Sequence, residues 1–150
     1  MTTRQSIITA LVALFETITA ANGYSTNLGQ HVEEWKTWEV NQDTKTDTLV
    51  IRDTKCDIIE LEEDDNAGDY HFKRLTVQAI IITSGTEAPE TLRTLLDDVY
   101  RCIGTAATLG GIALDIECEG DQTDIDRQAR TYGATLVTIA ITYRVTRWRD

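Results

Sequence analysis

The chain has 150 residues and carries 25 acidic against 14 basic side chains, which gives a formal net charge of −11 at pH 7. This length is typical of one domain, and the hydrophobic share of 41% is enough for a core that needs no disulfide or metal. So acidic a protein is expected to repel nucleic acid rather than grip it, although solubility alone explains the charge equally well. We therefore predict a single domain spanning residues 1–150.

The cysteines and histidines argue against a disulfide framework and against a zinc site. Cys56, Cys102 and Cys118 are odd in number and widely spaced, and no CxxC pair occurs. His31 and His71 form no cluster with them, and zinc requires clustered ligands. No apolar run approaches the roughly 20 residues that a membrane-spanning helix needs. We expect buried free thiols in a protein made in a reducing cytosol, without a membrane segment.

The first predicted element is an amphipathic helix that begins after Thr2 and ends at Asn22-Gly23. Thr2 and Gln5 fit a capping box, in which each side chain binds the backbone N–H group of the other residue. The Asn-Gly pair tolerates the left-handed conformation that ends many helices. The apolar residues fall on one helical face, which we expect to join the core: Ile7, Ile8, Leu11, Val12, Phe15 and Ile18.

Residues 24–40 are predicted to form short extended pieces around a pair of tryptophans. Trp35 and Trp38 stand on a polar background, where they are either half-buried core residues or interface anchors. We favour the core interpretation slightly. The run over residues 41–47 has no apolar side chain and is predicted to be an exposed loop.

A long hairpin with an acidic tip is predicted next. Two short strands, at residues 49–51 and 56–61, lead into the acidic, turn-rich segment 60–69. The returning strand covers residues 70–83, where apolar side chains recur at every second position. Three successive isoleucines, at 80–82, indicate burial on both faces of a sheet.

The second predicted helix is the clearest element of the sequence. Pro89 suits its first turn, where the missing N–H group of proline does no harm, and Gly104 suits its end. Its apolar face consists of five residues at helical spacing: Leu92, Leu95, Leu96, Val99 and Ile103.

Two strands are expected after the Gly110-Gly111 pair. In the first, period two predicts that four carboxylates share one face, namely those of Asp115, Glu117, Glu119 and Asp121. The other face would hold Ile112, Leu114, Ile116 and Cys118. The last strand covers residues 135–146 with a similar alternation. The order of elements predicts an α+β fold, in which a mixed, mainly antiparallel sheet with a long hairpin packs against two main helices.

The row of four carboxylates is the best candidate for chemistry in the sequence. Its oxygens are suited to a calcium or magnesium ion, or to a general acid and base. Neighbours two apart on a strand are about 7 Å apart, so one ion would need further ligands from elsewhere. We therefore favour a solvated or lumen-facing acidic surface. No catalytic residue, metal or cofactor is predicted.

Basic residues gather only near the C-terminus. Arg144, Arg147, Trp148 and Arg149 would suit either a phosphate backbone or the acidic surface of a neighbouring subunit. Because the chain is so acidic, we favour the subunit contact.

With these elements placed, the sequence resembles the tail terminator proteins of long-tailed bacteriophages, also called tail completion or minor tail proteins. Four segments carry the resemblance. The first helix leads into Gly23-Tyr24-Ser25-Thr26-Asn27-Leu28-Gly29, and the central strand carries Leu75-Thr76-Val77-Gln78-Ala79-Ile80. The second helix, at 90–99, runs into Thr108-Leu109-Gly110-Gly111-Ile112, and the closing strand ends in Ile139-Ala140-Ile141-Thr142-Tyr143-Arg144.

The resemblance implies an α+β fold and a structural, non-enzymatic role in the virion. Members of this family form six-fold rings that cap the head-proximal end of the tail tube, stop its growth and provide a docking surface for the neck. DNA passes through the bore. The partners implied are therefore other copies of the chain, the tail tube protein and a neck or head-tail connector protein. The resemblance carries over no catalytic residue and no interface position.

Two surfaces of this chain are candidates for roles in such a ring. An acidic bore would let DNA slide, so we hypothesise that the carboxylate row or the hairpin acids Glu60, Glu62, Glu63, Asp64 and Asp65 line the channel. The polar loop is expected to contact the tube or neck protein through Asn41, Gln42, Asp43, Thr44, Lys45, Thr46 and Asp47.

Three other functions remain open from the sequence. A neck completion protein or the tail tube protein itself would have a similar build. A small metal-dependent enzyme would use the carboxylates between Asp115 and Asp121. A binding module for a small ligand is the third, although the sequence has no signature of an apolar pocket.

Overall fold

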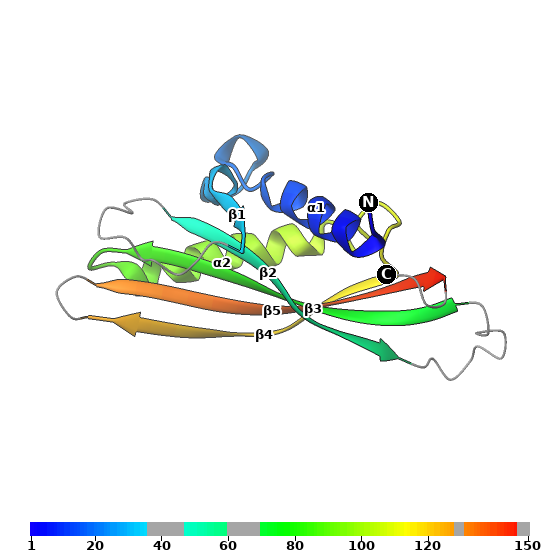
Figure 1. Ribbon diagram of the computed structural model, residues 1–150. Coiled ribbons are helices and arrows are strands. Elements are labelled where there is room, and N and C mark those ends of the chain that lie inside the picture. The colour runs from blue at the N-terminus through cyan, green and yellow to red at the C-terminus, as the bar shows by residue number, and fades with distance from the viewer. Residues whose placement is uncertain (36–46, 60–69, 128–130, 147–150) are drawn as a thin grey trace.

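The computed structural model describes residues 1–35, 47–59, 70–127 and 131–146, and these residues form an α+β fold (Figure 1). Its helices are α1 (Thr3–Phe15) and α2 (Ala88–Gly104), with short 3-10 turns at Ala20–Asn22 and Leu28–Gln30. Its strands are β1 (Val32–Glu34), β2 (Thr48–Ile59), β3 (Tyr70–Ser84), β4 (Asp115–Asp126) and β5 (Tyr132–Thr146).

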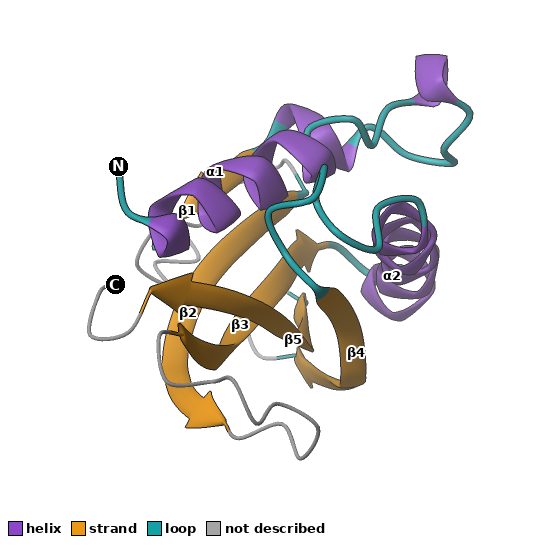
Figure 2. Ribbon diagram, turned by 90° about the vertical axis from the view of Figure 1, so that its right-hand side faces the viewer, coloured by secondary structure: helices purple, strands orange, loops and turns teal. Residues whose placement is uncertain are grey.

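The strands form one mixed sheet in the order β1-β2-β3-β5-β4. β1 is parallel to β2, and every other neighbouring pair is antiparallel. Both helices lie on the same side of this sheet (Figure 2). The predicted fold class is thereby confirmed, including the long hairpin, because β2 pairs with β3 from Thr48–Ile82 to Ile59–Phe72.

The prediction of two separate strands before the hairpin tip was wrong. Residues 48–59 form the single strand β2, which pairs with β3 on both sides of a bulge between Asp53 and Lys55. The polar run in its middle resembles a turn in sequence, but the bulge accommodates one extra residue without ending the pairing. The predicted acidic tip lies outside the described residues.

Helix α1 begins as predicted and ends earlier. The Thr2 hydroxyl accepts a hydrogen bond from the Gln5 N–H group at 3.1 Å. The Gln5 side chain donates to the Thr9 hydroxyl at 3.2 Å, so we find no reciprocal half of the capping box here. The helix ends at Phe15 rather than at residue 22, because the chain turns there and Gly29 packs directly on its last turn.

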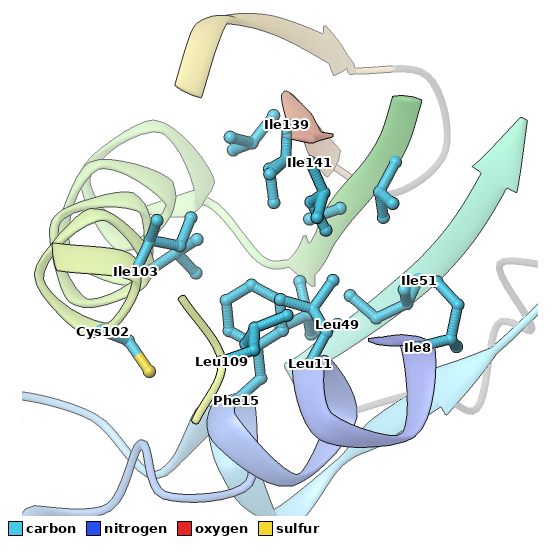
Figure 3. Close-up of a cluster of buried hydrophobic side chains, with 14 of the residues drawn as sticks. Ile8, Leu11, Phe15, Leu49, Ile51, Cys102, Ile103, Leu109, Ile139 and Ile141 are labelled. Carbon is cyan, nitrogen blue, oxygen red and sulfur yellow. The ribbon is translucent and has the colours of Figure 1, made fainter. Parts of the chain in front are cut away.

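The core lies between the two helices and the face of the sheet that they cover. Figure 3 shows Ile8 and Leu11 of α1 beside Leu49 and Ile51 of β2, all nearly inaccessible to solvent. The predicted apolar face of α2 is confirmed, with Leu92, Leu95, Val99 and Ile103 buried and Leu96 packed at the margin. β3 and β5 contribute alternate residues: Leu75, Val77, Ala79, Ile81, Val137, Ile139, Ile141 and Tyr143.

Candidate functional site

The acidic strand β4 forms one edge of the sheet, next to β5 (Figure 1). Six of its 12 residues are Asp or Glu. Asp115 pairs with Thr142 and Glu117 with Ala140 of β5, on the sheet face opposite the helices. Such charges protect a sheet edge against indiscriminate strand pairing. The edge is thus an exposed acidic surface.

The prediction that all four carboxylates share one face was wrong. A bulge lies between Cys118 and Gly120, where the glycine has φ of 133°. Glu119 is the extra residue, and beyond it the alternation is inverted, so Asp121 pairs with Val137 on the helix side. One inserted residue therefore separates Asp121 from the rest of the row.

Asp121 instead binds helix α2. The Tyr100 hydroxyl donates a hydrogen bond to Asp121 Oδ2 at 2.7 Å. Burial raises the pKa of Tyr100, and the hydrogen-bonded carboxylate raises it further, to about 12. Nearby, the hydroxyls of Thr123 and Thr135 are 2.8 Å apart. The first contact joins the second half of β4 to α2, and the second contact joins it to β5.

Arg74 of β3 neutralises part of the acidic row on the opposite face. Its Nη2 atom lies 2.7 Å from Glu119 Oε1 and 3.9 Å from Glu117 Oε2. These side chains are largely open to solvent, so the pairs contribute at most about 1 kcal/mol to stability. Asp115 and Asp124 have no side-chain hydrogen bond or ion pair within the described part of the chain.

Many of the residues that the sequence singled out lie outside the described residues. These are Glu60, Glu62, Glu63, Asp64 and Asp65 of the hairpin tip, Asn41, Gln42, Asp43, Thr44, Lys45 and Thr46 of the loop, and Arg147, Trp148 and Arg149. Of the predicted contact residues, Asp47 accepts a hydrogen bond from the Thr83 hydroxyl. Arg144 is exposed, with its guanidinium carbon 4.5 Å from the centre of the Tyr70 ring.

The predicted apolar face of the β4 region is only partly formed. Ile116 and Cys118 pack against the core, as expected. Ile112 and Leu114 precede the strand and are 40% and 52% exposed. They belong to the turn after α2, which Gly110 and Gly111 enter in left-handed conformations.

Asp98 is a buried carboxylate that the sequence reasoning missed. It is fully inaccessible on α2 and accepts hydrogen bonds from Ser25 N at 3.1 Å and from Thr26 N and Oγ1 at 2.8 and 2.6 Å. This carboxylate therefore ties the segment before β1 to α2. Its position between Leu95 and Cys102 on the apolar stripe was the available signal.

Trp35 is a second residue whose placement differs from expectation. We favoured the core for it, but its side chain is 53% exposed, whereas Trp38 lies outside the described residues. The indole Nε1 donates to Asp53 Oδ1 at 2.6 Å, and Arg4 Nε donates to Asp53 Oδ2 at 2.6 Å. Burial alone would raise the pKa of Asp53, but the hydrogen bonds from Trp35 and Arg4 outweigh it and lower that pKa.

Within the described residues, no three His, Cys, Asp or Glu side chains come together to hold a metal ion. The helices in that part of the chain are too short or too polar to cross a membrane. No protein-family model matches this chain, and no curated protein matches it.

Proposed function

We propose that this chain is a structural virion protein that forms a ring on the head-proximal end of a phage tail tube. In this role it ends tube growth and joins the tail to the neck. The family resemblance described above suggests the class. The α+β fold, with two helices on one side of a mixed sheet, agrees with the architecture that the resemblance implies.

The observation that best supports a DNA-conducting ring is the acidic edge strand β4. Asp115 and Glu117 face away from the helices, and Asp124 pairs with Ala134 on that same face. Repeated around a ring, such carboxylates would repel the phosphate backbone and let DNA pass without specific binding. Asp121 has a structural partner in Tyr100, so we leave it out of the proposed channel lining.

The proposed partners follow from this role. Six copies of the chain would form the ring, which would contact the tail tube protein on one side and a neck or head-tail connector protein on the other. The loop over residues 41–47 and the basic residues from Arg144 onward remain our candidates for these contacts. Each chain carries a net charge of −11, so copies of it repel one another. Contacts between these basic side chains and the acidic surface of a neighbouring copy would offset that repulsion.

Native mass spectrometry over a concentration series, with negative-stain images of the same sample, tests the assembly. We expect single closed rings of about six subunits, the symmetry that the resemblance implies, since a head-to-tail contact closes when its rotation permits. Rings that stack into growing tubes would instead identify a tail tube protein. Monomers at every concentration, alone and with tail tubes present, would contradict the proposal.

A further inference from the structure

Trp35 is held in a conformation that burial does not explain. Its φ is 51°, in the left-handed region, which costs a bulky residue roughly 1 kcal/mol or more. The backbone is fixed by a hydrogen bond from Trp35 N to Ile51 O at 3.0 Å, and the indole by its bond to Asp53. Even so, half of the side chain is exposed. The indole is therefore oriented by polar contacts rather than by packing in the core.

A cavity of about 390 Å³ opens beside this indole. Its lining includes Gln5 and Ile8 of α1, the capping residue Thr2, and Glu34 and Trp35. The volume falls within the usual range for sites that take a small ligand or a single long side chain. Arg52 lies over the Trp35 ring at 5.8 Å and does not line the cavity, whereas Trp35 lines it and is 53% exposed.

The charges around this cavity favour a cation. Arg4 and Asp53 neutralise each other through their ion pair at 2.6 Å. Glu34 is exposed at the cavity, and within the described residues its carboxylate has no hydrogen bond or ion pair. Thr2 already caps the first turn of α1 through its hydroxyl. Among the described residues, the cavity thus has one unpaired carboxylate and one half-exposed indole in its lining.

We propose that this cavity binds an arginine side chain of a protein partner. A guanidinium is planar, so it can stack on the indole of Trp35 while its N–H groups bind the Glu34 carboxylate. An anion is disfavoured, because Glu34 would repel it and Arg4 is engaged by Asp53. This inference does not depend on the ring proposal, since it concerns the side chain that the cavity takes and not the assembly that presents it.

The test follows the indole N–H signals of the folded, ¹⁵N-labelled chain in NMR spectra. The Trp35 signal among the three tryptophans is assigned as the one lost in Trp35→Phe. N-acetyl-arginine amide should shift it saturably, whereas the neutral isostere N-acetyl-citrulline amide should shift it far less. Glu34→Gln should weaken arginine binding about two- to five-fold, the range for one exposed ion pair or cation–π contact.

A matched variant distinguishes the effect of the Glu34 charge on arginine binding from the effect of the net charge of the protein. Glu90→Gln removes one exposed carboxylate from α2, outside the cavity lining, and should leave arginine binding unchanged. The proposal is overturned by an unsaturable shift, by equal binding of the citrulline and arginine amides, or by equal effects of Glu34→Gln and Glu90→Gln.

Discussion

The phenol of Tyr100 and the carboxylate of Asp121 are joined by a hydrogen bond of 2.7 Å, which connects α2 to the edge strand β4. The bond exists because the bulge at Glu119 turns Asp121 toward the helices and away from Asp115 and Glu117. An acid that the sequence assigns to the exposed row therefore stabilises the fold. Asp115, Glu117 and Asp124 remain on the sheet face opposite the helices.

Tyr100→Phe should reduce stability in a pH-dependent way. At pH 7 we expect a loss of about 1 kcal/mol, the usual net contribution of one hydrogen bond. The folded-state pKa of Tyr100, about 12, is higher than the ordinary 10.0, so its stabilisation is complete below pH 10 and lost as pH rises toward 12. Urea unfolding of both proteins from pH 7 to 12 measures the difference, which should shrink over that upper interval. A constant difference up to pH 12 would refute this assignment.

Asp98→Ala should destabilise the protein by roughly 3 kcal/mol, because it leaves buried backbone donors without an acceptor. The amides of Ser25 and Thr26 lose their partner, so their hydrogen exchange should accelerate beyond the global effect. Urea unfolding and exchange measured by NMR provide the two readouts. Asp97→Ala is the control, since Asp97 is exposed and no such bonds are found for it in the described part of the chain. Equal losses in the two variants would contradict the role assigned to Asp98.

Gly29→Ala should cost about 1–3 kcal/mol, because an added Cβ atom would lie 2.5 Å from the Glu16 carbonyl oxygen. The contact is with backbone, which cannot move aside as a side chain would. Gly104→Ala, at the end of α2, meets nothing within 4 Å and should be neutral or slightly stabilising. Thermal unfolding of both variants checks this contrast, and an undisturbed Gly29→Ala protein would show that the turn after α1 adapts.

Asp53→Asn should lower stability most at pH values above 3.8, the ordinary pKa of the aspartate carboxyl group. The folded-state pKa of Asp53 is lowered, so its stabilisation is present above the unfolded value and is lost as pH falls through the folded one. The difference in unfolding free energy between the two proteins should therefore decrease on acidification below pH 4. Unfolding curves at a series of acidic pH values measure it. A difference that grows at low pH would show that the carboxylate of Asp53 is not the stabilising form.

The fold class was predictable because long stretches of the main elements are periodic. Apolar residues alternate over 75–81 of β3 and 137–145 of β5 and recur at helical spacing in α2, and these residues are buried. The faces of β4 were not predictable, since a single bulge residue inverts every side chain beyond it. The sequence of β4 contains Gly120 at the bulge, but a glycine alone does not indicate which way the alternation will continue.

Two of the polar contacts described above join residues that are distant in the sequence. Trp35 binds Asp53, 18 positions away, and Asp98 binds Thr26, 72 positions away. Local patterns predict faces of helices and strands, and they contain no information about which partner a buried carboxylate will meet. The position of Asp98 on the apolar stripe of α2 indicates burial, but it does not indicate that Ser25 and Thr26 are the partners of its carboxylate.

Growth of tail tubes in the presence of this chain tests the proposed function most directly. Phage tail tube protein is assembled with and without the purified chain, and tube lengths and ends are recorded by electron microscopy. The proposed role predicts that growth stops and that one end of each tube carries a single ring of this protein. Unchanged tube lengths with no protein bound at either end would contradict it.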